Sequence, residues 1–250
     1  MRAERSAWYR RRVQPLLVLW DVDNTLVDAD GAGQRLYQHA LDEMYGLRLP
    51  KAPRSFAGRT DSAIVREVLE LAGVPDPELQ VGPFQAFMTA KALDLFADVR
   101  ARGRALPGAA AAVAALASAL PGGQLYQSLL TGNIPELARV KLMAVGLTEH
   151  IDLSIGAYGD ISAVRADLVD VARSKAAARH GADFGGRATV LIGDTPSDIE
   201  AAIASGASSV GVATGEFTLA ELITAGADIG LPDLTDTRNV VESVLGATDA

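Results

Sequence analysis

The sequence predicts an α/β fold with a doubly wound, Rossmann-like parallel sheet and an inserted helical block. From residue 106 onward, short apolar segments alternate with helical segments. Because parallel strands need a crossover between them, this alternation is typical of a parallel sheet covered by helices on both faces. Residues 31–100 show helical periodicity without a convincing strand, which places the inserted block after the first strand.

The first predicted strand is an apolar run over residues 16–20. Five apolar residues in succession are typical of a strand that is buried on both faces. Two carboxylates, Asp21 and Asp23, follow it directly. Like charges at the end of a buried strand need either solvent or a bound cation.

Three segments of the inserted block repeat apolar residues at spacings of three and four, namely 31–46, 60–73 and 77–103. Gly and Pro residues separate them, as expected between helices. The sequence is therefore divided into a basic N-terminal tail (1–14), a core domain (15–29 and 104–250) and the helical block (30–103).

The rest of the core domain alternates between the two kinds of element. Its predicted helices cover residues 107–120, 134–146, 165–181 and 197–206. Its predicted strands cover residues 124–132, 151–159, 188–194 and 208–215. From about residue 232, a weaker helical pattern predicts a segment that packs on an edge of the sheet.

Composition excludes several classes of function. The 250 residues include no cysteine, which excludes disulfides, thiolate zinc sites and a cysteine nucleophile. A net charge of -8 argues against nucleic acid or an anionic membrane as the partner. Because the chain has neither a membrane-length apolar run nor the apolar stretch of a secretory signal, we expect a cytoplasmic protein with a solvated basic tail. The sequence does not indicate an oligomeric state.

Polar residues gather where four of the predicted strands end, which is the edge where doubly wound sheets bind ligands. These segments are Asp21 to Thr25, Thr131 to Asn133, Gly156 to Arg165 and Gly193 to Asp198. Asp21, Asp23 and Asp194 would converge there, with Asp198 behind them. Because such charges repel one another, we expect a hard divalent cation with oxygen ligands, and Mg²⁺ fits best.

The second of these segments suits an anion. Thr131 offers a hydroxyl, Gly132 permits close backbone approach, and Asn133 can cap the helix that begins at residues 134–135. Free amides at a helix N-terminus favour phosphate. Taken alone the segment reads as an ordinary strand-to-helix turn, but beside the aspartates it favours phosphate binding.

Three motifs in order resemble those of the haloacid dehalogenase superfamily. They are Asp21-Val22-Asp23-Asn24-Thr25-Leu26, then Leu130-Thr131-Gly132-Asn133, then Ile192-Gly193-Asp194-Thr195-Pro196-Ser197-Asp198. The resemblance spans residues 16–214, and the helical block is similar to the alpha-helical cap of that superfamily. Residues 56–61 resemble the Gly-x-Thr-Asp stretch of its phosphoglycolate-phosphatase-like members.

The resemblance implies a reaction for each matching residue. Asp21 would attack phosphorus and form an aspartyl-phosphate, and Asp23 would protonate the leaving alcohol and then activate water. Mg²⁺ would be held by the carboxylates of Asp21 and Asp194 and by the backbone carbonyl of Asp23, with Asp198 in support. Thr131 would form a hydrogen bond with the transferring phosphoryl group. The implied enzyme is a Mg²⁺-dependent hydrolase of a small phosphorylated metabolite, and positioning and charge neutralisation would supply most of its rate.

The superfamily's third motif, a Lys that pairs with the nucleophile and phosphate, has no obvious counterpart here. Lys141 is preferred, because it lies two helical turns past Asn133 and helical side chains lean toward the N-terminus. Arg165, nearer the place where the motif usually falls, is the alternative and is assigned to substrate binding.

The helical block also offers candidate residues for substrate binding. Arg59 could pair with a carboxylate or a second phosphate, and Thr60 lies beside it. Thr60 or Asp61 could equally cap the helix that follows.

The presence of Asp23 separates related activities. Dehalogenases and phosphonate-cleaving members of the superfamily lack this second aspartate, which leaves a phosphatase or a phosphosugar mutase. A non-catalytic phosphometabolite-binding protein is a further alternative, although a pure binder needs no acid beside a nucleophile. The substrate itself cannot be named from the sequence.

Overall fold

The computed structural model describes residues 14–248, except residues 52, 54 and 121–123. The basic tail expected over residues 1–14 lies outside the described residues, apart from Gln14.

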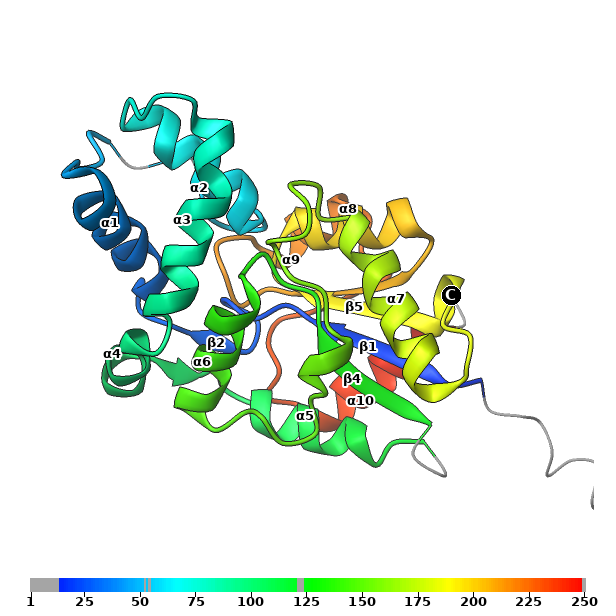
Figure 1. Ribbon diagram of the computed structural model, residues 1–250. Coiled ribbons are helices and arrows are strands. Elements are labelled where there is room, and N and C mark those ends of the chain that lie inside the picture. Colours follow the sequence, from blue (N-terminus) through cyan, green and yellow to red (C-terminus); the bar gives the residue numbers. More distant parts are fainter. Residues whose placement is uncertain (1–13, 52, 54, 121–123, 249–250) are drawn as a thin grey trace, which may run out of the picture.

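A five-stranded parallel sheet forms the centre of the protein (Figure 1). Its spatial order is β4-β1-β5-β6-β7. The strands are β1 (Leu16–Trp20), β4 (Leu125–Leu129), β5 (Thr189–Gly193), β6 (Ser208–Val212) and β7 (Ile229–Leu231). The predicted fold class, a doubly wound parallel sheet, is confirmed.

Strand β1 lies inside the sheet, as its apolar sequence predicts. All five of its residues are buried, with Leu17 and Leu19 in one apolar cluster and Val18 and Trp20 in the other. The chain pairs β1 with β4 on one side and with β5 on the other, so the direction of winding reverses at β1. Such a reversal leaves a crevice beyond the carboxyl ends of the strands, and there Asp21 follows β1.

Helices cover both faces of the sheet (Figure 1). Residues of α7 (Asp167–His180) and α8 (Pro196–Ser205) share the cluster that contains Leu17 and Leu19. Residues of α5 (Ala109–Ala117), α6 (Pro135–Val145) and α10 (Thr237–Gly246) share the other cluster. The short helix α9 (Leu219–Thr224) packs beside β6 and β7.

The helical block consists of α1 (Ala32–Tyr45), α2 (Asp61–Leu71), α3 (Pro77–Lys91) and α4 (Asp94–Arg102). The single helical segment expected over residues 77–103 therefore forms two helices. The chain enters and leaves the block through two short antiparallel strands, β2 (Val27–Asp28) and β3 (Arg104–Ala105). Helix α4 of the block packs on α6, so the block is attached to the helix that follows β4.

The strand expected over residues 151–159 is wrong. This segment contains a 3-10 turn, η4 (Leu153–Ile155), and meets the sheet at one bridge between Leu130 and Ala157. The side chain of Asp152 accepts a hydrogen bond of 3.0 Å from the backbone N–H of Ser154, which favours a turn over an extended chain. Strands β2, β3 and β7 and helix α9 were not predicted, because each is too short to show a period.

No helix among the described residues is both long enough and apolar enough to cross a membrane.

A glycine at the start of α5 permits close packing against the segment before α10. Gly108 has φ of 84°, and a Cβ there would lie 2.0 Å from the carbonyl oxygen of Leu234. Gly73, at the end of α2, has φ of 73° and open space around it. Replacing either glycine by alanine would strain the backbone, but only at Gly108 would the added Cβ also clash with a neighbouring atom.

We therefore expect Gly108→Ala to lower the free energy of unfolding by about 2–4 kcal/mol, from strain and overpacking together. Gly73→Ala should cost about 1–2 kcal/mol, from strain alone. Urea denaturation of both variants measures the difference, and equal losses would contradict the close contact with Leu234.

Candidate active site

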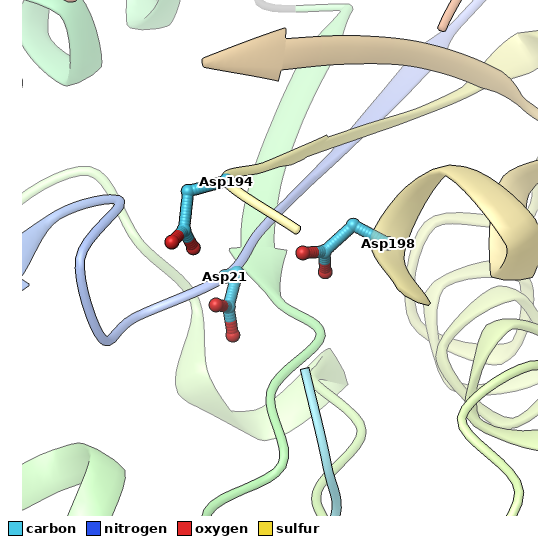
Figure 2. Close-up of side chains that lie close together, drawn as sticks. All are labelled: Asp21, Asp194 and Asp198. Carbon is cyan, nitrogen blue, oxygen red and sulfur yellow. The ribbon is translucent and has the colours of Figure 1, made fainter. Parts of the chain in front are cut away.

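Three buried carboxylates meet at the carboxyl end of the sheet (Figure 2). Asp21 follows β1, Asp194 follows β5, and Asp198 lies in the first turn of α8. One oxygen of each lies within 4.8 Å of the others, and the residues are 6%, 1% and 2% exposed. The sequence predicted a convergence of Asp21, Asp23 and Asp194, with Asp198 behind them. The structure instead groups Asp198 with Asp21 and Asp194, and Asp23 is not part of this cluster.

One guanidinium lies against this cluster. Nη2 of Arg165 lies 2.8 Å from Oδ1 of Asp21 and 2.6 Å from Oδ1 of Asp198. The same nitrogen donates to the backbone carbonyl of Leu130 at 3.1 Å. Asp198 has a further role, since its Oδ2 accepts from Thr195 in the capping box of α8. Asp198 is therefore held firmly, in the supporting position expected for it.

Among the described residues, no basic side chain forms an ion pair with Asp194. Its Oδ1 accepts a 3.1 Å hydrogen bond from the hydroxyl of Thr25, and its buried Oδ2 has no partner among the described residues. Burial raises the pKa of Asp194 to about 8, and the charges of Asp21 and Asp198 add to this effect. Burial also raises the pKa of Asp21 to about 6, although Arg165 opposes the rise.

These carboxylates fit a hard divalent cation. All the donors are oxygens, they are close enough to share one ion, and Asp194 keeps an unpartnered oxygen. Burial and the neighbouring carboxylates raise the pKa values of Asp21 and Asp194, and a divalent ion bound there would favour their charged forms.

Asp23 belongs to a separate group of contacts. Nζ of Lys141 lies 2.7 and 2.6 Å from the two carboxylate oxygens of Asp23, and 2.6 Å from Oδ1 of Asn133. Nδ2 of Asn133 donates to Oδ2 of Asp23 at 2.8 Å. The carboxylate of Asp23 is thereby directed toward Lys141 and Asn133. A role for its backbone carbonyl as a metal ligand stays a prediction.

The preference for Lys141 as the partner of Asp21 is wrong, because Arg165 makes that contact. Lys141 does lean back toward the strand end, as its place on α6 predicts, but there it meets Asp23. Arg165 reaches Asp21 because the irregular segment before α7 passes beside β4, where Leu130 bridges Ala157. Sequence periodicity carries no signal for the path of such a segment.

Thr131 and Asn133 line the site from the segment after β4. Oγ1 of Thr131 accepts hydrogen bonds from the backbone N–H of Asn133 at 3.3 Å and from its Nδ2 at 2.8 Å. The hydroxyl proton of Thr131 is then available to a ligand. Asn133 was expected to cap α6, which is wrong: the N-cap is Ile134, and no side chain caps it from that position.

Asp61 of the helical block satisfies this helix end instead. Its Oδ2 accepts a 2.7 Å hydrogen bond from the backbone N–H of Ile134, and the hydroxyl of Tyr37 donates to its Oδ1. The backbone N–H of Asp61 donates to the carbonyl of Gly132 at 2.6 Å. Burial raises the pKa of Asp61 to about 6. The roles of Asp61 and Tyr37 in joining the block to the core were missed, because nothing local in the sequence pairs them.

Two glycines allow this close approach. A Cβ at Gly132 would lie 1.9 Å from the carbonyl oxygen of Arg59, and a Cβ at Gly159 would lie 1.8 Å from the carbonyl oxygen of Gly132. Gly132 thus permits a close backbone approach, as expected, and the group that approaches is the helical block.

Arg59 and Thr60 have contacts inside the helical block. Nη1 of Arg59 lies 2.5 Å from Oε2 of Glu67, and Nη2 donates to the carbonyl of Ala63 at 3.2 Å. Thr60 is the N-cap of α2, where its hydroxyl oxygen accepts from the backbone N–H of Ala63. Arg59 lines the cavity described next and Thr60 does not. Substrate binding by either residue stays a prediction.

A cavity of about 220 Å³ lies between the core and the helical block. Its core lining includes Asp21, Asp23, Asp194, Thr131, Asn133, Lys141 and Arg165, and its lining from the block includes Gln34, Tyr37, Phe56, Arg59, Asp61 and Ile64. The candidate site residues of the core therefore share one cavity with residues of the inserted segment.

Sequence comparison decides the family. The profile of the haloacid dehalogenase-like hydrolases matches residues 18–202, which is most of the chain. The chain belongs to this family. A second profile, of HAD-hydrolase-like sequences, matches residues 168–237. No curated protein matches the chain.

Solved structures share the fold at low sequence identity. A hydrolase from Pseudomonas syringae is 23% identical, with a TM-score of 0.63 over 92% of this chain and 99% of that one. A predicted phosphoglycolate phosphatase from Haemophilus somnus is 16% identical, with a TM-score of 0.63 over 91% and 97%. A protein assigned as a beta-phosphoglucomutase from Bacteroides vulgatus is 15% identical, with a TM-score of 0.62 over 98% and 95%.

The raised pKa of Asp194 predicts a pH dependence for the metal-free protein. The pKa of Asp194 is about 8 in the folded protein, and its ordinary value is 3.8. Between these two pH values, Asp194 holds a proton in the folded state and has lost it in the unfolded state. Stability therefore falls as the pH rises through this window. In EDTA, Tm should be higher at about pH 6 than at about pH 8.

Asp194→Asn should weaken that dependence, and Mg²⁺ should raise the Tm of the unmodified protein more at the higher pH. Thermal melts in EDTA and in Mg²⁺ measure both effects. Asp42→Asn, at an exposed position of α1, is the control and should leave the dependence unchanged. A Tm in EDTA that is flat over this range would contradict the unpaired burial of Asp194.

Proposed function

We propose that this protein is a Mg²⁺-dependent phosphatase that hydrolyses a small phosphomonoester through an aspartyl-phosphate. One observation carries the proposal: two aspartates two residues apart lie in different environments. Asp21 is buried beside a metal-compatible carboxylate cluster, and Asp23 is partly exposed beside Lys141 and Asn133. Separate environments give two carboxylates separate roles.

Asp21 is the nucleophile in this proposal. Arg165 engages its Oδ1, which leaves Oδ2 to attack phosphorus. The new bond joins Oδ2 to phosphorus as the bond from phosphorus to the leaving oxygen breaks. The hydroxyl of Thr131 donates a hydrogen bond to a phosphoryl oxygen. Bound at Asp21 and Asp194, with Asp198 behind them, Mg²⁺ would neutralise charge on the phosphoryl group.

Asp23 moves the protons. In the first step its carboxylic acid donates a proton to the leaving alcohol, and in the second its carboxylate accepts one from water. That water attacks phosphorus, the bond to Asp21 breaks, and inorganic phosphate leaves. Lys141 and Asn133 hold the Asp23 side chain in one orientation throughout.

We further propose that residues 15–29 and 104–250 act as the core domain and that residues 30–103 act as a cap. The cap supplies one wall of the cavity, and the contacts of Asp61 with Ile134 and Gly132 keep it closed over the core. A closed wall excludes bulk water, which protects the aspartyl-phosphate from uncontrolled hydrolysis.

The fold similarity to a protein assigned as a beta-phosphoglucomutase favours a phosphosugar mutase as the second candidate. The covalent step is common to both reactions. In a mutase the phosphoryl group passes to another hydroxyl, whereas a phosphatase passes it to water. Inorganic phosphate released in equal amount to substrate consumed supports the phosphatase, and isomerised sugar phosphate without phosphate release would support the mutase.

Asp21→Asn should abolish turnover, because an amide cannot form the acyl phosphate. The assay measures phosphate release over phosphoglycolate, sugar phosphates and nucleotides, with and without Mg²⁺. Circular dichroism and Tm should show that the variant stays folded. Full activity of Asp21→Asn would refute the mechanism.

Asp23→Asn tests the proton transfer separately. A 4-nitrophenolate leaving group needs no proton, whereas an alkoxide does. We therefore expect kcat/KM to fall by about 10²–10⁴-fold for an alkyl phosphate and far less for 4-nitrophenyl phosphate. Equal losses for the two substrates would rule out Asp23 as the general acid.

A further inference from the structure

The cations of the cavity all have anionic partners already. Three basic side chains line it, namely Arg59, Lys141 and Arg165. Lys141 contacts both oxygens of Asp23, and Arg165 contacts Asp21 and Asp198. Both lie at the catalytic end, beside the expected position of the phosphoryl group. Among the described residues, Arg59 is the basic side chain that lines the cavity from the helical block.

Arg59 is held by its own helix. Its Nη1 lies 2.5 Å from Oε2 of Glu67, and its side chain is 27% exposed against 19% for Glu67. Its Nη2 donates to the carbonyl of Ala63 at 3.2 Å, and Nη1 also donates to the carbonyl of Ser55 at 3.4 Å. These contacts engage both terminal nitrogens, so a second anion on a substrate would compete with Glu67 for the charge of this guanidinium.

The remaining charged groups among the described lining residues of the cavity are acidic. Asp28, Asp30, Asp61 and Glu216 line it beyond the catalytic aspartates. Asp28 pairs with Arg104 at 2.5 Å, and Arg104 does not line the cavity. Asp61 accepts hydrogen bonds from Tyr37 and Ile134, and Glu216 accepts one of 3.3 Å from Ser55. A carboxylate or second phosphate placed here meets like charge and, among the described lining residues, no unengaged cation.

We propose, resting on the phosphatase function above, that the enzyme selects phosphomonoesters whose leaving alcohol carries no second anion. Its substrates are phosphorylated polyols or amino alcohols. Glu67 sets this specificity as a positioning residue, because it neutralises the guanidinium that would otherwise bind a carboxylate. Discrimination of this kind works by repulsion as much as by attraction.

Three probes of equal length test the inference, since they differ at the second carbon alone. They are 2-phosphoglycolate, 2-hydroxyethyl phosphate and phosphoethanolamine, which carry a carboxylate, a hydroxyl and an ammonium there. Each is measured as an inhibitor of 4-nitrophenyl phosphate hydrolysis, so that turnover of the probe is not required. We expect phosphoglycolate to bind at least about fivefold more weakly than the other two.

Glu67→Gln tests the assigned cause. Release of Arg59 should tighten phosphoglycolate binding by about fivefold and leave 2-hydroxyethyl phosphate unchanged. Adding Arg59→Gln to that variant should cancel the gain in phosphoglycolate binding. If Glu67 had only a structural effect, removing Arg59 would not cancel the gain. Glu70→Gln, at an exposed position of the same helix, is the control and should change nothing.

The outcomes separate this inference from the proposed function. Phosphoglycolate binding as tight as 2-hydroxyethyl phosphate in the unmodified enzyme would overturn the inference and leave the phosphatase intact. An unchanged preference in Glu67→Gln would overturn the role of Glu67. If 4-nitrophenyl phosphate is not hydrolysed with Mg²⁺, the phosphatase proposal fails, and the probes are then ranked by the Tm shift that each produces.

Discussion

The ion pairs of Arg165 with Asp21 and Asp198 lie in the interior, where an unpaired charge is costly. Three carboxylates share that interior and one guanidinium faces them, so negative charge remains in excess. Burial raises the pKa values of Asp21 and Asp194, and the charges of the neighbouring carboxylates add to the rise. The cluster is tolerated because the surrounding sheet and helices fix its position, and the same excess is what makes the site a receptor for a cation.

Asp21 and Asp23 lie in different environments although only Val22 separates them in the chain. Asp21 ends the buried strand and faces the carboxylate cluster, and Asp23 has turned away toward Lys141 and Asn133. Asn24 follows Asp23 with φ of 58°, in the left-handed region that Asn tolerates, so the chain turns directly after the two aspartates.

The features of this structure that the sequence predicts are those that depend on residues close together in the chain. Strand β1 and the parallel sheet depend on local patterns and on strand order, and these predictions are confirmed by the structure. Strand order also placed Asp21 near Asp194, but the structure adds Asp198 to them and directs Asp23 toward Lys141. The path of residues 151–165 depends on Asp152 turning the chain and on one bridge to Leu130, and neither has a periodic signature. For that reason the assignment of the Asp21 contact to Lys141 failed. The contact of Asp61 with Ile134 joins residues 73 positions apart, which a single sequence does not reveal.

The paired strands β2 and β3 bring the two ends of the helical block together, with Val27 opposite Ala105. To the core, the whole block is therefore equivalent to the loop of a hairpin. The entropy of closing such a loop grows slowly with its length, so the core bears little additional cost for a long insertion at this point. The block can consequently differ in length and sequence without altering the register of β1. In the proposed function, substrate preference could then change independently of the aspartates proposed for catalysis.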